Sequence, residues 1–326
     1  MVRKKMLIAI IVLAIIAIMV YSLPPPSPIP IDIAIGTSPY EVSGLIYLAE
    51  EKGFFRDSGL NVTINRYDTG LYAIADLNQG RLDVATAADY AFAGRVLAGD
   101  PIVVAGSIGT DDFHYLVIRK ESGIADGRDL RGRTIGVSKR TSGEFFLGRY
   151  LELHGLRHTD VVLIDLAPVQ MKEALASGAV DAVVTWPPTL YDIEDTFGED
   201  LLIWPVQGGQ KMYWLLIVPE EGDQTAIERL LRALQQAEEF AQRNPEESQR
   251  IVDQRLATPA GEQVRAWERT RLFLSLEQSL LIALEDEARW MIRENLTDNM
   301  AMPDYLSRLR YEWLDSIKPG SVRIIR

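Results

Sequence analysis

Residues 77–85 read LNQGRLDVA, and a similar stretch, ALASGAVDAVVT, returns at residues 174–185. This repeated pattern is the strongest indication of the fold. In both stretches a helical run ends at a glycine, and an aspartate then leads into a short apolar run. Glycine readily adopts the positive φ at which many helices end, and the apolar run is typical of a buried parallel strand. We interpret both turns as parts of the fold rather than as ligand contacts.

Strands and helices alternate around the first of these turns. We predict strands at residues 31–36, 60–66, 82–86 and 102–106, with helices at 41–51, 71–78 and 90–97 between them. Ser38 is expected to cap the first helix, and Pro39 suits its first position. This alternation predicts a doubly wound sheet of parallel strands joined by crossover helices.

The alternation then begins again, which indicates a second α/β unit. Its predicted strands cover residues 115–119, 130–137, 161–166, 181–185 and 215–218, its predicted helices cover 144–154 and 169–177, and the pattern is helical from Gln224 to Ser316. We therefore expect residues 31–114 and 215–326 to form lobe 1, with C-terminal helices, and residues 115–214 to form lobe 2. Connecting strands near residues 114–118 and 213–218 would form a hinge that lets the lobes close around a ligand.

The N-terminal sequence predicts that the folded part of the protein is located outside the cytoplasm. Basic residues 3–5 precede an apolar run at 6–20 that extends to residue 23, as in a signal peptide or a membrane-anchor helix. The basic flank stays in the cytoplasm, so the rest of the chain is expected to be extracytoplasmic, in the periplasm or at the cell surface, and either anchored or secreted. Residues 24–30, PPPSPIP, predict a stiff proline-rich tether.

Composition excludes several classes of function. The net charge of −12 makes a nucleic-acid partner improbable, because the acidic surface repels phosphates. The chain has no cysteine, which excludes disulfides, thiolate metal sites and a cysteine nucleophile. His154 and His158 have a spacing that could bind a metal on a helix, but the loop-like sequence around Gly155 predicts solvated surface histidines. We expect no metal and no cofactor.

Five segments in order resemble one known family. They are residues 48–62 (LAEEKGFFRDSGLNV), 77–85, 129–137 (DLRGRTIGV), 174–188 and the ending at 303–319. Together they resemble the ABC-importer solute-binding proteins for nitrate, sulfonate, taurine and pyrimidine precursors. That resemblance implies a type II periplasmic-binding-protein fold, a small-molecule ligand, and partners in the ABC permease and ATPase subunits, with attachment to the membrane through the N-terminus.

Candidate ligand contacts lie in loops after the carboxyl ends of strands, where open α/β sheets bind ligands. Hydroxyl residues open several predicted helices there, and free amides at helix N-termini attract anions or polar oxygens. Capping alone would also explain them. Aromatic residues could hold the body of an organic ligand. The predicted ligand-binding residues are Thr37, Ser38, Tyr40, Glu41, Asp68, Thr69, Gly70, Ala88, Asp89, His114, Thr141, Ser142, Gly143, Trp186 and Trp214.

The class of ligand stays open at this stage. Several carboxylates crowd these loops, and two of them in the cleft would repel a bare anion such as nitrate. They would favour a ligand with an amine, such as taurine or an aminopyrimidine. Two other classes are pyrimidine-precursor synthase-like proteins and membrane-tethered ligand sensors. Histidines are sparse and no G-x-S-x-G, H-E-x-x-H or P-loop pattern occurs, so we expect a binding protein and not an enzyme.

Overall fold

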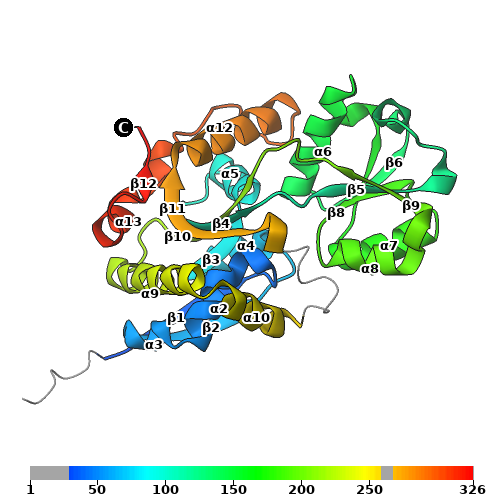
Figure 1. Cartoon of the computed structure of the whole chain (residues 1–326). Helices are drawn as coiled ribbons and strands as arrows, with labels where there is room; N and C mark the ends of the chain where they lie inside the picture. The colour runs from blue at the N-terminus through cyan, green and yellow to red at the C-terminus, as the bar shows by residue number, and fades with distance from the viewer. Residues whose placement is uncertain (1–28, 258–266, 326) are drawn as a thin grey trace, which may run out of the picture.

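Two separate β-sheets organise the part of the chain that the structure describes. This computed structural model describes residues 29–257 and 267–325. The predicted N-terminal helix and residues 24–28 of the predicted tether lie outside that part. Within the described ranges, no helix has the length and apolar character needed to span a membrane. Figure 1 shows the sheets side by side, each with its own helices, which confirms two α/β lobes.

The first sheet has seven strands and forms the centre of what we call lobe 1. In spatial order they are β12 (Val322–Arg323), β11 (Arg271–Glu277), β4 (Ile102–Asp111), β10 (Met212–Pro219), β3 (Val84–Ala88), β1 (Ile31–Thr37) and β2 (Leu60–Arg66). β1 runs parallel to β2 and β3, but β10 runs antiparallel to both of its neighbours, β3 and β4. The sheet is therefore mixed, whereas the sequence pattern predicted parallel strands.

The second sheet has five strands and forms the centre of lobe 2. Their order is β7 (Val162–Asp165), β6 (Thr134–Val137), β8 (Ala182–Thr185), β5 (Tyr115–Arg119) and β9 (Leu201–Pro205). β6 is parallel to β7 and β8, and β5 is antiparallel to β8 and β9. In both lobes the strand that follows a passage between the sheets, β10 or β5, runs antiparallel to its neighbours, so its direction is set by the crossing and not by a crossover helix.

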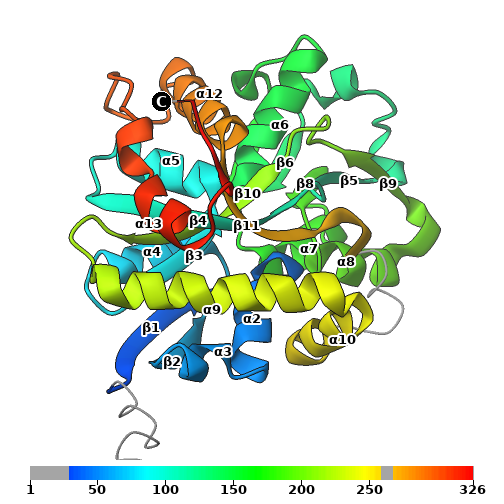
Figure 2. The same ribbon diagram turned by 60° about the vertical axis from the view of Figure 1, so that its left-hand side comes forward.

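Helices cover both sheets. Those of lobe 1 are α2 (Gly44–Glu51), α3 (Phe54–Asp57), α4 (Gly70–Leu77), α5 (Asp89–Leu97), α9 (Gln224–Arg243), α10 (Pro245–Leu256), α12 (Gln278–Arg293) and α13 (Tyr311–Ile317), and those of lobe 2 are α6 (Ser142–Leu153), α7 (Pro168–Ala176) and α8 (Thr189–Phe197). Figure 2 shows the long α9 lying across lobe 1, where it packs against α2, α3 and α13.

Short 3-10 turns complete the chain at Glu41–Ser43, Lys120–Ser122, Gly127–Leu130, His158–Asp160, Gly198–Asp200 and Leu306–Arg308. The first of them corrects one prediction. Helix α2 begins at Gly44, and Tyr40 precedes the 3-10 turn, so Ser38 and Pro39 lie outside the helix that they were expected to cap and open. A sequence pattern places such boundaries poorly, because a 3-10 turn and an α-helical turn have similar residue preferences.

The predicted helical region after Gln224 is wrong in one place. Residues 271–277, RLFLSLE, form β11, which pairs antiparallel with β4. Leu274 and Leu276 are buried and alternate with more exposed residues, which is the period of a strand. The charged helices on either side obscured this short alternation.

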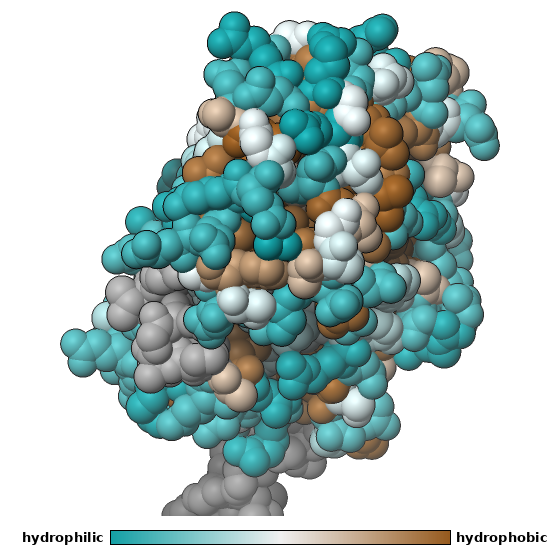
Figure 3. All heavy atoms as spheres, turned by 90° about the vertical axis from the view of Figure 1, so that its right-hand side faces the viewer, coloured by the Kyte–Doolittle hydropathy of each residue, from teal (hydrophilic) through white to brown (hydrophobic). Residues whose placement is uncertain are grey.

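Apolar cores occupy the inside of each lobe and the contact between them. The larger core spreads over lobe 1 and continues into α6, and a smaller one lies between the second sheet and the pair α7 and α8. The outer side of the molecule on the right of Figure 1 is mostly hydrophilic, with scattered apolar patches (Figure 3). Exposed apolar residues of lobe 2 are Leu153, Val162, Ile164 and Val169.

The repeated glycine–aspartate turn has the same role in both lobes. Gly80 and Gly178 end their helices with φ of 70° and 71°, which confirms the predicted positive φ. Oδ2 of Asp83 accepts a hydrogen bond of 2.7 Å from the backbone amide of Ala34, in β1. Oδ2 of Asp181 accepts one of 2.8 Å from the amide of Thr134, in β6. Each aspartate thus fixes the register of its strand against the neighbouring strand.

We predict that Asp181→Ala lowers the free energy of unfolding by about 1 kcal/mol, because the amide of Thr134 loses its acceptor. Asp181→Asn retains an acceptor oxygen and should cost less. Urea unfolding followed by circular dichroism measures both. The exposed Glu173→Ala, on the helix just before the turn, is the control. Equal stability of Asp181→Ala and the control would show that this bond does not hold the strand.

Candidate ligand-binding site

A small cavity lies between the two lobes. Its volume is about 40 Å³, and it is lined by Tyr40, Thr69, Gly70, Leu71, Ala88, Ala91, Asp111, Phe113, His114, Thr141, Ser142, Trp186, Met212 and Trp214. Both sheets contribute, since Tyr40 and Trp214 belong to lobe 1 while Ser142 and Trp186 belong to lobe 2. A volume this small favours a solute of few heavy atoms.

Three aromatic rings form one wall of the cavity. The ring of Tyr40 meets the edges of Trp186 and Trp214 at centroid distances of 6.4 and 6.0 Å. The hydroxyl of Tyr40 donates to the carbonyl of Asp68 at 2.7 Å, and Nε1 of Trp214 donates to Oγ of Ser43 at 3.0 Å. Because these bonds point into the protein, the rings of Tyr40 and Trp214 offer mainly apolar surface to a ligand.

Helix N-termini supply polar groups to the cavity. Helices α4, α5 and α6 begin there, after Thr69, Ala88 and Thr141, and none of these residues caps its helix with a side-chain hydrogen bond. The hydroxyl of Thr141 instead donates to the carbonyl of Ser138 at 2.6 Å. Oγ of Ser142 is buried and has no partner among the described residues. Uncapped first-turn amides favour an anionic or strongly polar oxygen.

Glycine is required where α4 approaches the cavity. A Cβ atom at Gly70 would lie 2.5 Å from Cα of Ala87 and 2.7 Å from the carbonyl oxygen of Thr86. Backbone atoms cannot move aside as a flexible side chain can. Gly70 therefore lets the first turn of α4 lie directly against β3 at the cavity.

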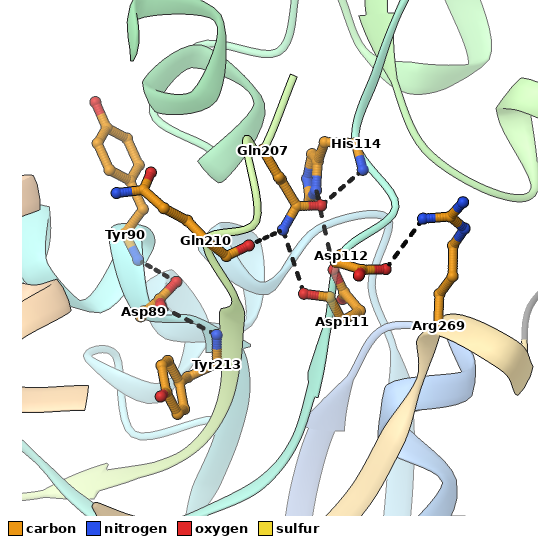
Figure 4. Close-up of polar contacts among 9 residues, drawn as sticks. All are labelled: Asp89, Tyr90, Asp111, Asp112, His114, Gln207, Gln210, Tyr213 and Arg269. Atoms are coloured by element: carbon orange, nitrogen blue, oxygen red, sulfur yellow. Dashed lines mark hydrogen bonds and ion pairs between the residues drawn. The ribbon is translucent and has the colours of Figure 1, made fainter. Parts of the chain in front are cut away.

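The chain passes between the lobes at residues 112–114 and 206–211, and Gln207 connects the two passages (Figure 4). Its Oε1 accepts a hydrogen bond of 2.8 Å from the amide of His114 and lies 3.2 Å from Nδ1 of that ring. Its Nε2 donates to the carbonyls of Asp111 and Gln210 at 3.2 and 3.1 Å. The side chain of Gln207 is buried, so these bonds are protected from water.

Burial keeps the imidazole of His114 uncharged. Desolvation lowers its pKa to about 4, against a smaller opposing effect of Gln207. The ring lies 5.3 Å from that of Trp186 and 5.1 Å from that of Phe146, so it packs as an aromatic wall of the cavity. At neutral pH His114 can therefore offer hydrogen bonds and ring surface, but no positive charge.

A pair of buried carboxyl groups lies behind the cavity. Asp89 accepts hydrogen bonds of 3.0 Å from the amides of Tyr90 and Tyr213 (Figure 4). Burial raises its pKa to about 7 despite these amides. Burial and the nearby Asp89 raise the pKa of Glu287, on α12, well above its usual value. Two buried acids in one place cannot both ionise cheaply, so the pair retains a proton near neutral pH.

We predict that Glu287→Gln makes the protein more stable than wild type above pH 7. A raised pKa means that the folded state holds a proton that the unfolded chain releases, so wild-type stability falls as pH rises from about 5 to 8. The glutamine cannot ionise, and its curve should be flatter, with a gain of about 1 kcal/mol at pH 8. The measurement is the free energy of urea unfolding between pH 4 and 8.

Glu285→Gln, on the same helix but exposed at its surface, is the control and should follow wild type. Parallel curves for wild type and Glu287→Gln would show that Glu287 is ionised in the folded protein.

Helices α12 and α6 hold the lobes together beside the cavity. The indole of Trp290, on α12, packs so closely on α6 that a Cβ at Gly148 would overlap it. Arg293 pairs with Glu152, and Nδ1 of His158 lies 2.6 Å from Oε2 of Glu294. The indole and these ion pairs join the C-terminal helix of lobe 1 to lobe 2.

The prediction of solvated histidines is wrong in part. His158 is half-buried in its contact with Glu294, and Nδ1 of His154 lies 2.8 Å from the carbonyl of Tyr150. Within the described ranges, no cluster suited to a metal occurs.

We predict that Gly148→Ala shifts the protein toward an open form, because the added methyl meets the Trp290 indole of the other lobe. Apparent ligand affinity should fall about tenfold without any change to the cavity lining. Small-angle scattering should show a larger radius of gyration without ligand and recovery at saturation. Gly94→Ala meets only the flexible Met291 inside lobe 1 and is the control. Unchanged affinity and radius would mean that this contact does not restrain closure.

Most of the predicted ligand-binding residues line the cavity, and six do not. Those that line it are Tyr40, Thr69, Gly70, Ala88, His114, Thr141, Ser142, Trp186 and Trp214. Thr37 bonds Ser43 and Thr86 inside the core, and the carbonyl of Ser38 accepts from Ser43 and Tyr47. The others outside the lining are Glu41, Asp68, Asp89 and Gly143. Ligand binding itself stays a prediction for every one of them.

Sequence reasoning missed five residues of the lining: Leu71, Ala91, Asp111, Phe113 and Met212. Leu71 and Ala91 lie within the first turn of predicted helices. A list that included every residue of those first turns would have contained them. Asp111 is one of the carboxylates noted near these loops but was left off the list, because the predicted strand at 102–106 ended at Gly106, whereas β4 continues to Asp111. Nothing in the sequence pattern distinguishes Met212.

The fold and the position of the cavity define a two-lobed solute-binding architecture. Residues 42–248 match the model of the family described as NMT1/THI5 like. The chain belongs to this family, which confirms the resemblance noted from its motifs.

The sequence identity between this chain and individual relatives is low. One relative is a candidate binding protein of Brucella abortus. It is 27% identical to this chain over 217 residues, which cover 64% of this chain and 66% of the relative. The match thus spans just under two thirds of that protein's length.

Solved structures share the fold at low sequence identity. The alkanesulfonate-binding protein SsuA from Xanthomonas axonopodis pv. citri, solved bound to MOPS, has a TM-score of 0.75 and 19% identity, covering 86% of this chain and 98% of that one. The desulfurization enzyme DSZB has a TM-score of 0.62 and 18% identity, covering 88% of this chain and 98% of its own. The fold is therefore shared by binding proteins and by an enzyme.

Proposed function

We propose that the protein is the solute-binding component of an ABC-type importer and captures a small organic solute with an acidic group, such as a sulfonate. The observation that carries this proposal is the cavity between the lobes, where helices α4 and α6 begin without side-chain caps. Such helix ends bind sulfonate or carboxylate oxygens through backbone amides and the helix dipole. The similarity to a structure of an alkanesulfonate-binding protein supports the same class of ligand.

The size and walls of the cavity fit that assignment. Tyr40, Trp186 and Trp214 offer apolar surface for the organic part of the solute, and the small volume of the cavity favours a small ligand. Hydrogen bonds across Gln207 hold the two passages between the lobes side by side, which is the geometry of a hinge. Closure of the lobes would remove the solute from water and strengthen each polar contact with it.

The proposal includes location and partners. The N-terminal signal or anchor helix predicted from residues 1–23 would place the folded part outside the cytoplasm. There it would deliver solute to a membrane permease driven by an ATPase. Co-purification of permease subunits with the full chain supports transport, whereas co-purification of a kinase supports the alternative of a tethered sensor.

Two other functions are less well supported. Pyrimidine-precursor binding agrees with the resemblance noted from the sequence motifs and with the aromatic wall. A reaction like that of the desulfurization enzyme has a precedent in the fold alone. One solved form of that enzyme is a mutant in which serine replaces a cysteine, whereas this chain contains no cysteine, so a thiol-dependent reaction is not supported here.

We predict that small sulfonates raise the melting temperature of the full chain by several degrees in a thermal-shift panel that also contains nitrate and aminopyrimidines. Ser142→Ala should weaken binding about tenfold, since its buried hydroxyl is available to donate to an anionic oxygen. Its stability without ligand should not fall, because that hydroxyl bonds no described residue. Isothermal titration measures the affinities.

Ser248→Ala is the matched control. Ser248 is also buried without a hydrogen-bond partner among the described residues, but it lies on α10 and does not line the cavity. It should leave affinity unchanged. A shift with aminopyrimidines alone would transfer the proposal to pyrimidine precursors, and no shift with any small solute would refute the binding function.

A further inference from the structure

A buried carboxyl group faces the cavity without a protein partner. Asp111 is the last residue of β4, lines the cavity, and is 1% exposed. Neither of its side-chain oxygens has a hydrogen-bond partner by ordinary geometry among the described residues. The nearby Gln207 bonds the backbone carbonyl of Asp111 and leaves the carboxyl free (Figure 4). Buried carboxyl oxygens without partners are rare in folded proteins and need an explanation.

Among the residues that the structure describes, none offers a positive charge to Asp111. Nδ1 of His114 lies 3.9 Å from Oδ1, but that ring is neutral at pH 7. Arg269 pairs with the neighbouring Asp112 at 3.4 Å and not with Asp111 (Figure 4). No lysine or arginine is among the described residues of the cavity lining. Lys139 and Arg140 line a neighbouring hollow instead.

The neighbouring acids make an unpaired charge on Asp111 still less favourable. Burial is the main cause that raises its pKa well above the usual value, and the charges of Asp89, Asp112 and Glu41 add to it, while the amide of Phe113 opposes them. In the absence of a solute the group therefore keeps its proton. An ionised Asp111 becomes favourable only when a cation enters the cavity and forms hydrogen bonds with its oxygens.

On this basis we propose that Asp111 is the residue that selects, among acid-bearing solutes, those that also carry a protonated amine or amidine. This inference rests on the proposed binding function and names its substrate class. The uncapped ends of α4 and α6 bind the acidic group, and the carboxylate of Asp111 binds the amine. A zwitterion satisfies both kinds of group, because its acidic group lies at the positive ends of the helix dipoles and its amine pairs with the carboxylate of Asp111.

The test compares pairs of solutes that differ only at the amine. The probes are 2-aminoethanesulfonate against 2-hydroxyethanesulfonate, and 3-aminopropanoate against 3-hydroxypropanoate, titrated calorimetrically into the full chain. Wild type should bind the amine of the preferred pair at least tenfold more tightly. Asp111→Asn, which is nearly isosteric, should abolish that preference. Asp112→Asn removes the adjacent acid outside the cavity and should keep it.

Proton release gives an independent readout. If the amine pairs with an ionised Asp111, then binding to wild type near pH 7 releases about one proton per ligand, seen as different heats in buffers of different ionisation enthalpy. Asp111→Asn should release none. A structural role for Asp111 would change stability but would not change this proton count.

The outcomes separate this inference from the function on which it rests. Wild type that binds the hydroxyl compounds as tightly as the amines, or Asp111→Asn that retains the preference, overturns the role of Asp111 while solute binding stands. Binding of only amine-free sulfonates has the same meaning, and then a protonated Asp111 donates to the anion. Failure of every solute to bind overturns the proposed function itself.

Discussion

The hydrogen bonds of Gln207 are the constraint on which the arrangement of the two lobes depends. The buried side chain of Gln207, in the second passage, bonds the amide of His114 and the carbonyl of Asp111 at the first passage and the carbonyl of Gln210 in its own passage. Because the passages are held side by side, the end of β4 and the starts of β5 and β10 meet at one place. His114 and Asp111, which both line the cavity, are direct neighbours of this joint. In the proposed function, hinge and binding site would therefore share these residues, and a solute that contacts either one would also contact the passages between the lobes.

Much of the fold could be predicted because its turns depend on residues that lie close together in the sequence. The turns around Gly80 and Gly178 need only a glycine with positive φ, an aspartate that reaches the next strand, and an apolar run. The parts that were missed depend on distant pairing. β11 is a strand because β4 lies beside it, and β10 is reversed because the chain returns from the other lobe; neither fact is encoded within a short window.

The candidate site was predictable to a similar extent and for a similar reason. Residues that open helices after strands, such as Thr69, Thr141 and Ser142, follow from topology alone. Whether a side chain in such a loop faces the cavity or the core depends on packing that the sequence does not display. Thr37 and Ser38 illustrate this, since the hydroxyl of Thr37 and the backbone carbonyl of Ser38 form hydrogen bonds inside lobe 1. Asp111 is the opposite case, because it follows a stretch of small residues that resembles a loop but forms the end of a fully buried strand.

The distribution of charge explains how a strongly acidic protein can bind an acidic solute. Asp111 in the cavity lining and the buried pair Asp89 and Glu287 have raised pKa values, so burial reduces the negative charge that these carboxyls carry. The positive contribution comes instead from the backbone at the ends of α4 and α6, which needs no lysine or arginine and leaves no cation exposed when the lobes open. A lysine in that position would hold an anion more strongly but would also slow its release. In the proposed site, backbone dipoles attract the solute most strongly when it lies in line with the helix ends, so a movement of α6 with lobe 2 would weaken that attraction. The proposed binding through helix ends would therefore couple release of the solute to opening of the lobes.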